Sequence, residues 1–369
     1  MHTGLTSFVS RDKGSSLTGA NTYESPKVMI PGYEVGPAVH RSRLRSVYRA
    51  TRLADGLAVV IKTLNAEYPS KQDVAALRRE FHIIQLLQSI EGVIRVHALE
   101  PHGNGNVAVV LEPFGCSLAD HMATQYHRAF SMECFFAIAI SIAETLSRVH
   151  ELDVVHKNIE PRSILVSDTD GVRLIDFSIS SELSRERPNR SWSRQLDGAL
   201  PYISPEQTGR MNRDLDYRSD FYSLGVTFFE MLTGELPFQG ASALEWVHSH
   251  ISKSPPAPSK IDPSIPEAVS GIILKLLAKN AEDRYQSGYG LVRDLSRCQR
   301  ELAQTGAVGK FVLGHLDVSR KFYIPQRLYG REPELAALTA LFERVVHGGT
   351  ELCMAVSYTH LTLPTNREV

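Results

Sequence analysis

The order of local patterns along the chain constrains its fold more than any single motif does. Short strand-like runs come first, at 46–49, 57–62, 94–99 and 107–111. Between the second and third runs, residues 73–90 place apolar side chains at helical spacing. From Ser131 onward the pattern becomes helical, in the segments 135–151, 221–233, 265–277 and 290–302, with strand-sized pieces at 163–166 and 172–175. A small β-rich part followed by a larger helical part predicts an α+β fold.

Composition excludes several classes of protein. Lys plus Arg number 40 and Asp plus Glu 41, so charge gives no reason to expect a nucleic-acid partner or an anionic membrane. The four cysteines have no metal-ligand spacing and are typical of reduced thiols in a cytoplasmic protein: Cys116, Cys134, Cys298 and Cys353. The longest apolar run, 135–143, is too short for a membrane segment, and the N-terminus lacks a signal-peptide pattern.

Four segments, in the right order and spacing, resemble the signature set of protein kinases. They are 59–62 (VVIK), 155–165 (VHKNIEPRSIL), 176–178 (DFS) and 204–206 (SPE). The resemblance implies a two-lobed protein-kinase-like fold over residues 33–300, with a small β-rich lobe and a larger helical lobe. It also implies ATP and Mg²⁺ as the cofactors, and no others.

The resemblance assigns roles to residues that match the family pattern. Lys62 would hold the ATP phosphates with Glu80 as its ion-pair partner, and Asp176 would ligate Mg²⁺. His156 would order the backbone near Asp176. The other matching positions support the fold: Glu206, Asp220 and Arg284.

The residues that serve phosphoryl transfer itself depart from the pattern. Asn158 stands in the place of the catalytic aspartate, and loss of a general base typically costs ~10²–10⁴-fold in rate. Glu160 replaces a lysine or asparagine near the γ-phosphate, where a carboxylate would repel developing negative charge. Ser163 replaces the asparagine that holds the second metal ion. Ser178 replaces the glycine of the metal-binding triplet, and Ala199 a threonine that faces substrate.

The phosphate-covering hairpin has lost its glycines. His40, Ser42 and Arg45 occupy the three glycine positions, and Gly36 lies too far upstream to replace one of them unless the hairpin contains an insertion. Glycine normally lets this backbone approach phosphate closely. The basic side chains of His40, Arg43 and Arg45 are compatible with attracting phosphate as charges, although we expect them to be solvated loop residues.

The amino-acid sequences of 202–213 and 216–225 resemble the kinase-like domain that begins bacterial hybrid signalling proteins. Those proteins continue into a P-loop AAA-type ATPase, and many add a GAF domain and a sensor histidine kinase. Residues 322–332 resemble the entry to that ATPase, although no G-x-x-x-x-G-K-[ST] follows. The implied partners are therefore the ATPase and sensor kinase domains of a longer protein, and the protein substrate is unknown.

These patterns predict five segments. Residues 1–30 form a flexible leader, 33–300 the kinase-like domain, and 301–327 a linker. Residues 328–355 are the truncated start of the ATPase, with a helix near 334–346 and a strand near 351–355. Residues 356–369 resemble a translated sequencing adapter and are expected to be a non-native tail.

Three functions remain open at this point. The changed catalytic loop favours a catalytically impaired pseudokinase that binds ATP and regulates the adjacent domains. The retained Lys62, Glu80 and Asp176 are also compatible with an active serine/threonine protein kinase. The lost glycines leave a third possibility, a scaffold that binds no nucleotide.

Overall fold

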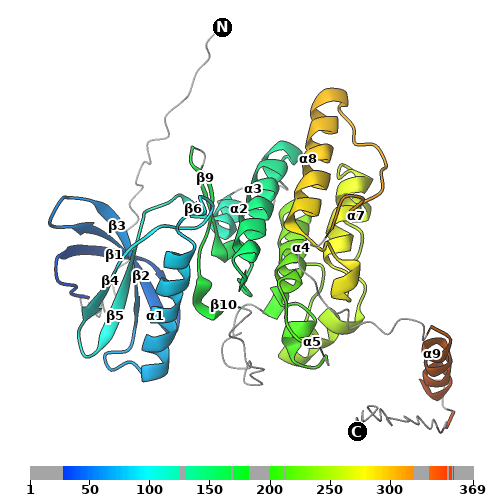
Figure 1. The fold of residues 1–369 in the computed structure, drawn as a ribbon, viewed down its shortest axis with the longest axis horizontal. Coiled ribbons are helices and arrows are strands. Elements are labelled where there is room, and N and C mark those ends of the chain that lie inside the picture. The colour runs from blue at the N-terminus through cyan, green and yellow to red at the C-terminus, as the bar shows by residue number, and fades with distance from the viewer. Residues whose placement is uncertain are drawn as a thin grey trace, which may run out of the picture.

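The structure is a computed structural model that describes residues 28–124, 130–167, 169–182, 200–211, 213–318, 332–346, 349–350 and 352. Strands dominate the first part and helices the second (Figure 1). The predicted α+β fold with a β-rich lobe and a larger helical lobe is confirmed. No helix among the described residues is long and apolar enough to cross a membrane.

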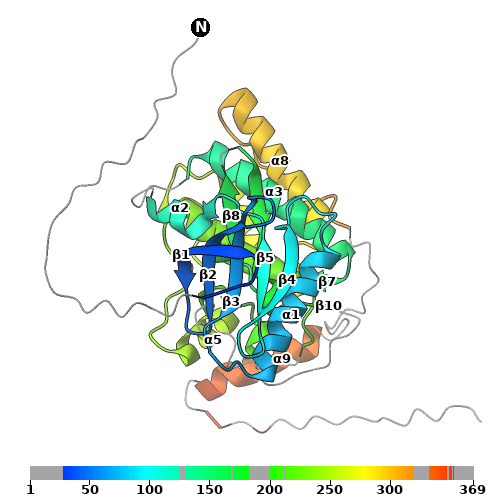
Figure 2. The same cartoon turned by 90° about the vertical axis from the view of Figure 1, so that its left-hand side faces the viewer.

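The N-terminal part is a five-stranded antiparallel sheet. Its strands are β1 (Tyr33–Arg41), β2 (Arg45–Arg52), β3 (Ala58–Leu64), β4 (Val96–His102) and β5 (Asn106–Leu111). Figure 2 looks onto this sheet, with the order β1-β2-β3-β5-β4. Helix α1 (Lys71–Leu86) begins at Ser70, whose side chain caps the amide of Asp73, and ends four residues before the predicted end. The sequence did not reveal β1, because most of its side chains are exposed and show no regular alternation.

The two faces of the sheet carry separate apolar clusters. One contains Ala50 and Ile61, and the other contains Leu64 of β3 with Leu77 of α1. In the register of β2 with β3, Val47 lies opposite Lys62 and Arg45 opposite Leu64. Directly opposed residues point to the same face of a sheet. Arg45, Val47 and Lys62 therefore share the face that α1 covers.

The helical part contains the larger core. Its helices are α2 (Leu118–Thr124), α3 (Met132–Glu151), α4 (Arg218–Thr233), α5 (Ala243–Ser252), α6 (Pro258–Ile261), α7 (Glu267–Leu276) and α8 (Gly288–Thr305). Short strands lie between them: β6 (Cys116–Ser117), β7 (Val154–Val155), β8 (Ile164–Ser167), β9 (Gly171–Leu174) and β10 (Ser181–Glu182). The segments predicted as helices from apolar spacing form α3, α4, α7 and α8, and those predicted as strands form β8 and β9.

Helix α4 is buried on almost every side, including polar side chains of its first turns such as Ser219 and Asp220. It ends at Gly234, which has φ 73° and donates its amide to the carbonyl of Glu230. That left-handed conformation favours glycine, so the sequence fixes the end of the helix here.

The packed domain extends beyond both predicted boundaries. Ile30, placed in the leader, is 3% exposed and belongs to the cluster of Ala50 and Ile61. Asp317, placed in the linker, accepts hydrogen bonds from the amide of Gln286 at 2.6 Å and the hydroxyl of Ser287 at 2.7 Å. The chain up to Asp317 therefore packs against the end of the helical part.

The segment assigned to an ATPase is described only in part. Helix α9 (Glu332–Val346) forms where a helix was predicted near 334–346. Of the predicted strand 351–355, only Leu352 is described. The leader before residue 28 and the tail 356–369 lie outside the described residues, so those domain assignments stay predictions.

Candidate functional site

Lys62, Glu80 and Asp176 come together from three elements. Lys62 Nζ on β3 lies 2.6 Å from Glu80 Oε1 on α1 and 2.8 Å from Asp176 Oδ1, which follows β9. Glu80 is 1% exposed. Burial raises the pKa of Asp176, but the cations of Lys62 and Arg45 outweigh it and hold that pKa well below its usual range. The carboxylate is therefore ionised at neutral pH.

Arg45 joins this cluster, which corrects the expectation of a solvated loop residue. Its Nη1 lies 3.5 Å from Glu80 Oε2 and 3.5 Å from Asp176 Oδ1, and its side chain is 20% exposed. The cause is the strand register, because Arg45 begins β2 on the face that Lys62 shares. That register was the signal that could have located it. His40 and Arg43, by contrast, are exposed.

The hairpin between β1 and β2 is tied to the end of β3. Ser46 Oγ donates to Asn65 Oδ1 at 2.6 Å, and Asn65 Nδ2 donates to the carbonyl of Ser42 at 2.7 Å. Gly36 lies within β1, where an added Cβ would meet the carbonyl oxygen of Arg49 at 3.1 Å. It serves strand packing and does not supply the missing phosphate-loop glycine.

Asn158 faces the carboxylate that the resemblance assigns to metal. Its Nδ2 donates to Asp176 Oδ2 at 3.1 Å. Because Asp176 is ionised, only the amino end of the amide can make this contact. The position of the usual base therefore presents a donor to Asp176.

The hydroxyl of Ser163 is engaged in a turn of the backbone. It accepts from the amide of Glu160 at 3.0 Å and donates to the carbonyl of the same residue at 2.9 Å. Ser163 is 1% exposed. The side chain closes the short 3₁₀ helix Pro161–Ser163 and is not turned toward solvent.

The environment of Glu160 is unfavourable to a charge. Burial raises the pKa of its carboxyl to about 7, and the negative charge of Asp176 adds to the effect. Burial therefore favours the protonated form of the Glu160 carboxyl more than an exposed glutamate would allow, and the expected repulsion of developing negative charge stays a prediction.

His156 and Asp220 support the backbone of the same loop. His156 is fully buried, and its Nε2 lies 2.9 Å from the carbonyl of Ile175 while Nδ1 accepts from the amide of Asn158. The ring thus links the loop to the residue before Asp176. Asp220 on α4 accepts from the amides of His156 and Lys157 at 2.8 and 2.7 Å. Both residues lie where the sequence placed structural roles.

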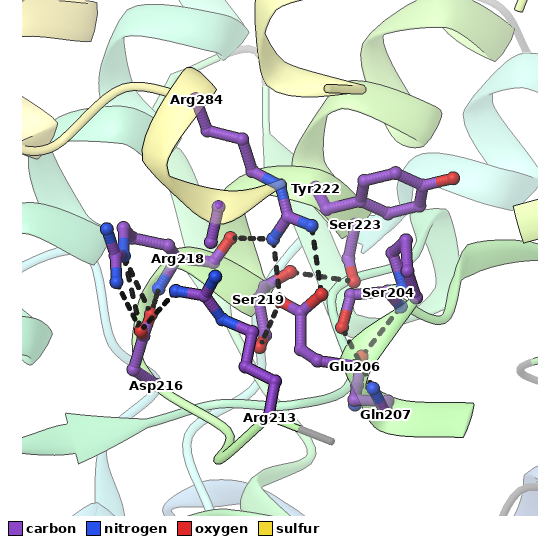
Figure 3. A network of polar contacts seen from close by, with 12 residues as sticks. Ser204, Glu206, Gln207, Arg213, Asp216, Arg218, Ser219, Tyr222, Ser223 and Arg284 are labelled. Carbon is purple, nitrogen blue, oxygen red and sulfur yellow. Dashed lines mark hydrogen bonds and ion pairs between the residues drawn. The ribbon is translucent and has the colours of Figure 1, made fainter. Parts of the chain in front are cut away.

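Glu206 and Arg284 form a buried pair in the helical part (Figure 3). Arg284 Nη1 and Nη2 donate to the two carboxylate oxygens of Glu206 at 2.6 and 2.9 Å. The guanidinium also donates to three backbone carbonyls, those of Ala278, Lys279 and Arg218. Burial raises the pKa of Glu206, but Arg284 outweighs it and lowers that pKa to about 2. The pair is therefore ionic and fully hydrogen-bonded.

Gln207 is a further connecting residue to which the sequence analysis gave no role. Its Nε2 donates to the carbonyl of Lys157 at 2.8 Å, and its Oε1 accepts from the amide of Ser204. It joins the segment 204–206 to the loop 155–165 that contains Asn158. Ser178 lies in the 3₁₀ helix Phe177–Ile179, while Ala199 lies outside the described residues.

The residues around Asp176 do not fit a bound Mg²⁺. Both of its oxygens face nitrogen donors of the chain, from Lys62 and Arg45 on one side and Asn158 on the other. Ser163, which replaces the asparagine of the second metal position, has its hydroxyl bound into its turn. Phosphate fits better, because Lys62 and Arg45 place two partly exposed cations together.

Comparison with known proteins agrees with the fold. Residues 41–292 match the family model described as "Protein kinase domain". The match covers more than half of the chain, so the chain belongs to the protein kinase family.

Three curated relatives illustrate the range of similar proteins. A hybrid signal transduction histidine kinase G of Dictyostelium discoideum is 41% identical over 46% of this chain and 6% of its own length. The serine/threonine-protein kinase PknB of Mycolicibacterium smegmatis is 32% identical over 74% of this chain and 44% of its own length. The probable serine/threonine-protein kinase SCO3848 of Streptomyces coelicolor is 29% identical over 79% and 44%. The chain thus spans less than half the length of these relatives.

Proposed function

We propose that this chain is a kinase-fold signalling module that binds ATP and is impaired in phosphoryl transfer. The observation that carries the proposal is the contact of Asn158 Nδ2 with Asp176 Oδ2 at 3.1 Å. A catalytic base must accept the proton of the substrate hydroxyl. The amide of Asn158 has no basic atom that could take up this proton, and its donor end is held by a carboxylate.

The phosphate-holding side of the site supports nucleotide binding. The pair of Lys62 with Glu80 is formed at 2.6 Å, and the Lys62 side chain is 12% exposed. A polyphosphate can therefore reach an oriented ammonium group. Lys62 and Glu80 therefore support nucleotide binding, whereas Asn158 does not support phosphoryl transfer.

The regulatory role extends to domains outside the described residues. The Dictyostelium relative carries the name of a hybrid histidine kinase and covers a much longer chain, which supports a kinase-like module linked to other signalling domains. The resemblance of 322–332 to an ATPase entry and the helix α9 point in the same direction. We therefore propose that the module regulates an adjacent ATPase and sensor histidine kinase, and that 356–369 is foreign to it.

Calorimetry with ATP tests the binding half of this proposal. The full chain is titrated with ATP in Mg²⁺ and in EDTA, and Lys62→Ala serves as the site variant. The exposed Lys253→Ala serves as the matched lysine control. Binding that disappears in Lys62→Ala and persists in Lys253→Ala supports a nucleotide-binding module. No binding at millimolar ATP in either solution contradicts it and leaves a scaffold.

An active serine/threonine kinase is the second candidate, and Glu160 favours it. A carboxyl with a pKa of about 7 in the catalytic loop has the proton affinity that suits a general base near neutral pH. If Glu160 replaced the missing aspartate, Glu160→Gln would abolish turnover of the wild-type chain. Absence of turnover in the wild type would exclude this candidate.

A further inference from the structure

The cluster around Lys62 balances its charges without any added ion. It contains two cations, Lys62 and Arg45, and two carboxylates, Glu80 and Asp176. Buried carboxylates need a compensating cation, because an unpaired charge loses its hydration. Without Arg45 the cluster would carry one surplus negative charge, which is the situation that draws in a metal ion.

Arg45 supplies the second positive charge that the carboxylates of Glu80 and Asp176 need. Oε2 of Glu80 is buried and has no hydrogen-bond partner among the described residues, yet Arg45 Nη1 lies 3.5 Å from it. The same nitrogen lies 3.5 Å from Asp176 Oδ1. The guanidinium therefore stands between both acids, at a residue where the family pattern has glycine and no charge.

The other side of Asp176 also opposes a metal ion. Asn158 presents its amino group to Oδ2, and a cation at that oxygen would face the same positive end of the amide dipole. A divalent ion would thus have to displace Arg45 and turn Asn158. Both contacts come from residues that differ from the family pattern, and both act in the same direction.

We propose that Arg45 is an internal cation that replaces the divalent metal ion at this site, so that the module binds a nucleotide polyphosphate without Mg²⁺. The proposal rests on the nucleotide-binding function proposed above. Arg45 and Lys62 are 20% and 12% exposed, so phosphate oxygens can reach both. A guanidinium offers paired donors to phosphate, which an ammonium group does not.

Mn²⁺ alone tests whether Arg45 occupies the metal position. Uptake of Mn²⁺ by the full chain is followed by the loss of its free paramagnetic resonance signal, with no nucleotide present. We expect Arg45→Gln to bind Mn²⁺ at least about tenfold more tightly than the wild type, because removing one nearby positive charge favours a cation by about that factor or more. The gain should vanish in the double variant Arg45→Gln/Asp176→Ala. Equal uptake by the wild type and Arg45→Gln would overturn the proposal.

Nucleotide binding then tests the consequence. A fluorescent ATP analogue should bind the wild type equally well in Mg²⁺ and in EDTA, whereas Arg45→Gln should require Mg²⁺. Arg45→Lys should retain metal-free binding, and Arg49→Gln, on the same strand but exposed, should behave as the wild type. Wild-type binding that requires Mg²⁺ would overturn the proposal. If the wild type binds no nucleotide at all, the proposed function fails, and the Mn²⁺ result still decides the role of Arg45.

Discussion

The charged residues of the helical core match the family pattern, whereas those of the Lys62 cluster match it only in part. In the core, Arg284 and Glu206 occupy the positions that the family resemblance predicts, and all three guanidinium nitrogens of Arg284 donate to acceptors at 2.6–3.0 Å. In the cluster, Lys62 and Glu80 match the family pattern, whereas Arg45 and Asn158 do not. Arg45 contacts the carboxylates of Glu80 and Asp176, and Asn158 contacts that of Asp176. The residues that support the fold match the family pattern, whereas Arg45 and Asn158 beside the Lys62 cluster differ from it.

The difference separates folding from turnover. A buried bidentate pair is required by the packing around it, since loss of either partner leaves a charge without water. The partly exposed cluster tolerates replacement as long as its charges balance. A kinase fold can therefore persist while its transfer site changes, and substitutions in the two regions should have different consequences.

The largest effect should follow Arg284→Ala. Removing the guanidinium leaves Glu206 buried and ionised, which costs about 3–5 kcal/mol of folding free energy. Urea unfolding of the full chain measures it. Arg297→Ala is the control, because Arg297 pairs with Glu301 on the surface of α8 and should change stability little. Similar losses in the two variants would contradict the distinction between core and surface pairs.

Asp220→Asn should have the next largest effect. Asp220 is fully buried and accepts from two backbone amides and from His150. Loss of its charge weakens these bonds and should cost about 2 kcal/mol. Asp262→Asn is the comparison, because Asp262 is only half-buried and accepts from a single backbone amide, that of Ser264. A wild-type unfolding midpoint for Asp220→Asn would show that the loop does not depend on this carboxylate.

Glu160→Gln should stabilise the protein at high pH only. The folded-state pKa is raised to about 7, above the ordinary 4.5, so ionisation destabilises the fold progressively as pH rises between these values. The variant should therefore gain about 2 kcal/mol at about pH 8 and nothing below about pH 4.5. Unfolding midpoints at several pH values measure the change, with exposed Glu235→Gln as control. A gain independent of pH would refute the buried-charge explanation.

Asn158→Asp should give the smallest change and sharpen the comparison most. It places a second carboxylate beside Asp176, so it should destabilise the chain by about 1 kcal/mol through lost hydrogen bonding and repulsion. Millimolar Mg²⁺ should recover the loss and leave the wild type unaffected. Asn280→Asp is a matched control, since Asn280 donates to Asp283 at 3.2 Å in an exposed turn. Equal Mg²⁺ responses in the two variants would argue against a site-specific effect.

The sequence predicted what motifs and periodicity determine locally. The order of strands and helices was recoverable because apolar spacing differs between the two parts, and Lys62, Glu80 and Asp176 were recoverable because each belongs to a recognisable segment. The position of Arg45 depends on the register of β2 against β3, which a motif count cannot provide.

Local sequence patterns also did not predict which way some side chains point or where the packed domain ends. Ser163 stands where the resemblance has the asparagine that holds a second metal ion, and only the turn geometry shows its hydroxyl bound to Glu160. Asp317 lies in a stretch without periodicity, yet it is held by Gln286 and Ser287 from the start of α8. Both depend on tertiary contacts between segments that the sequence does not place.

Phosphoryl transfer by the full chain tests the central claim most directly. Wild type, Asp176→Ala and the double variant Asn158→Asp/Glu160→Lys are incubated with labelled ATP, Mg²⁺ and a general protein substrate. We predict that the wild type transfers no more label than Asp176→Ala, and that the double variant exceeds both. Wild-type transfer that Asp176→Ala abolishes, and that the double variant does not increase, would contradict the account.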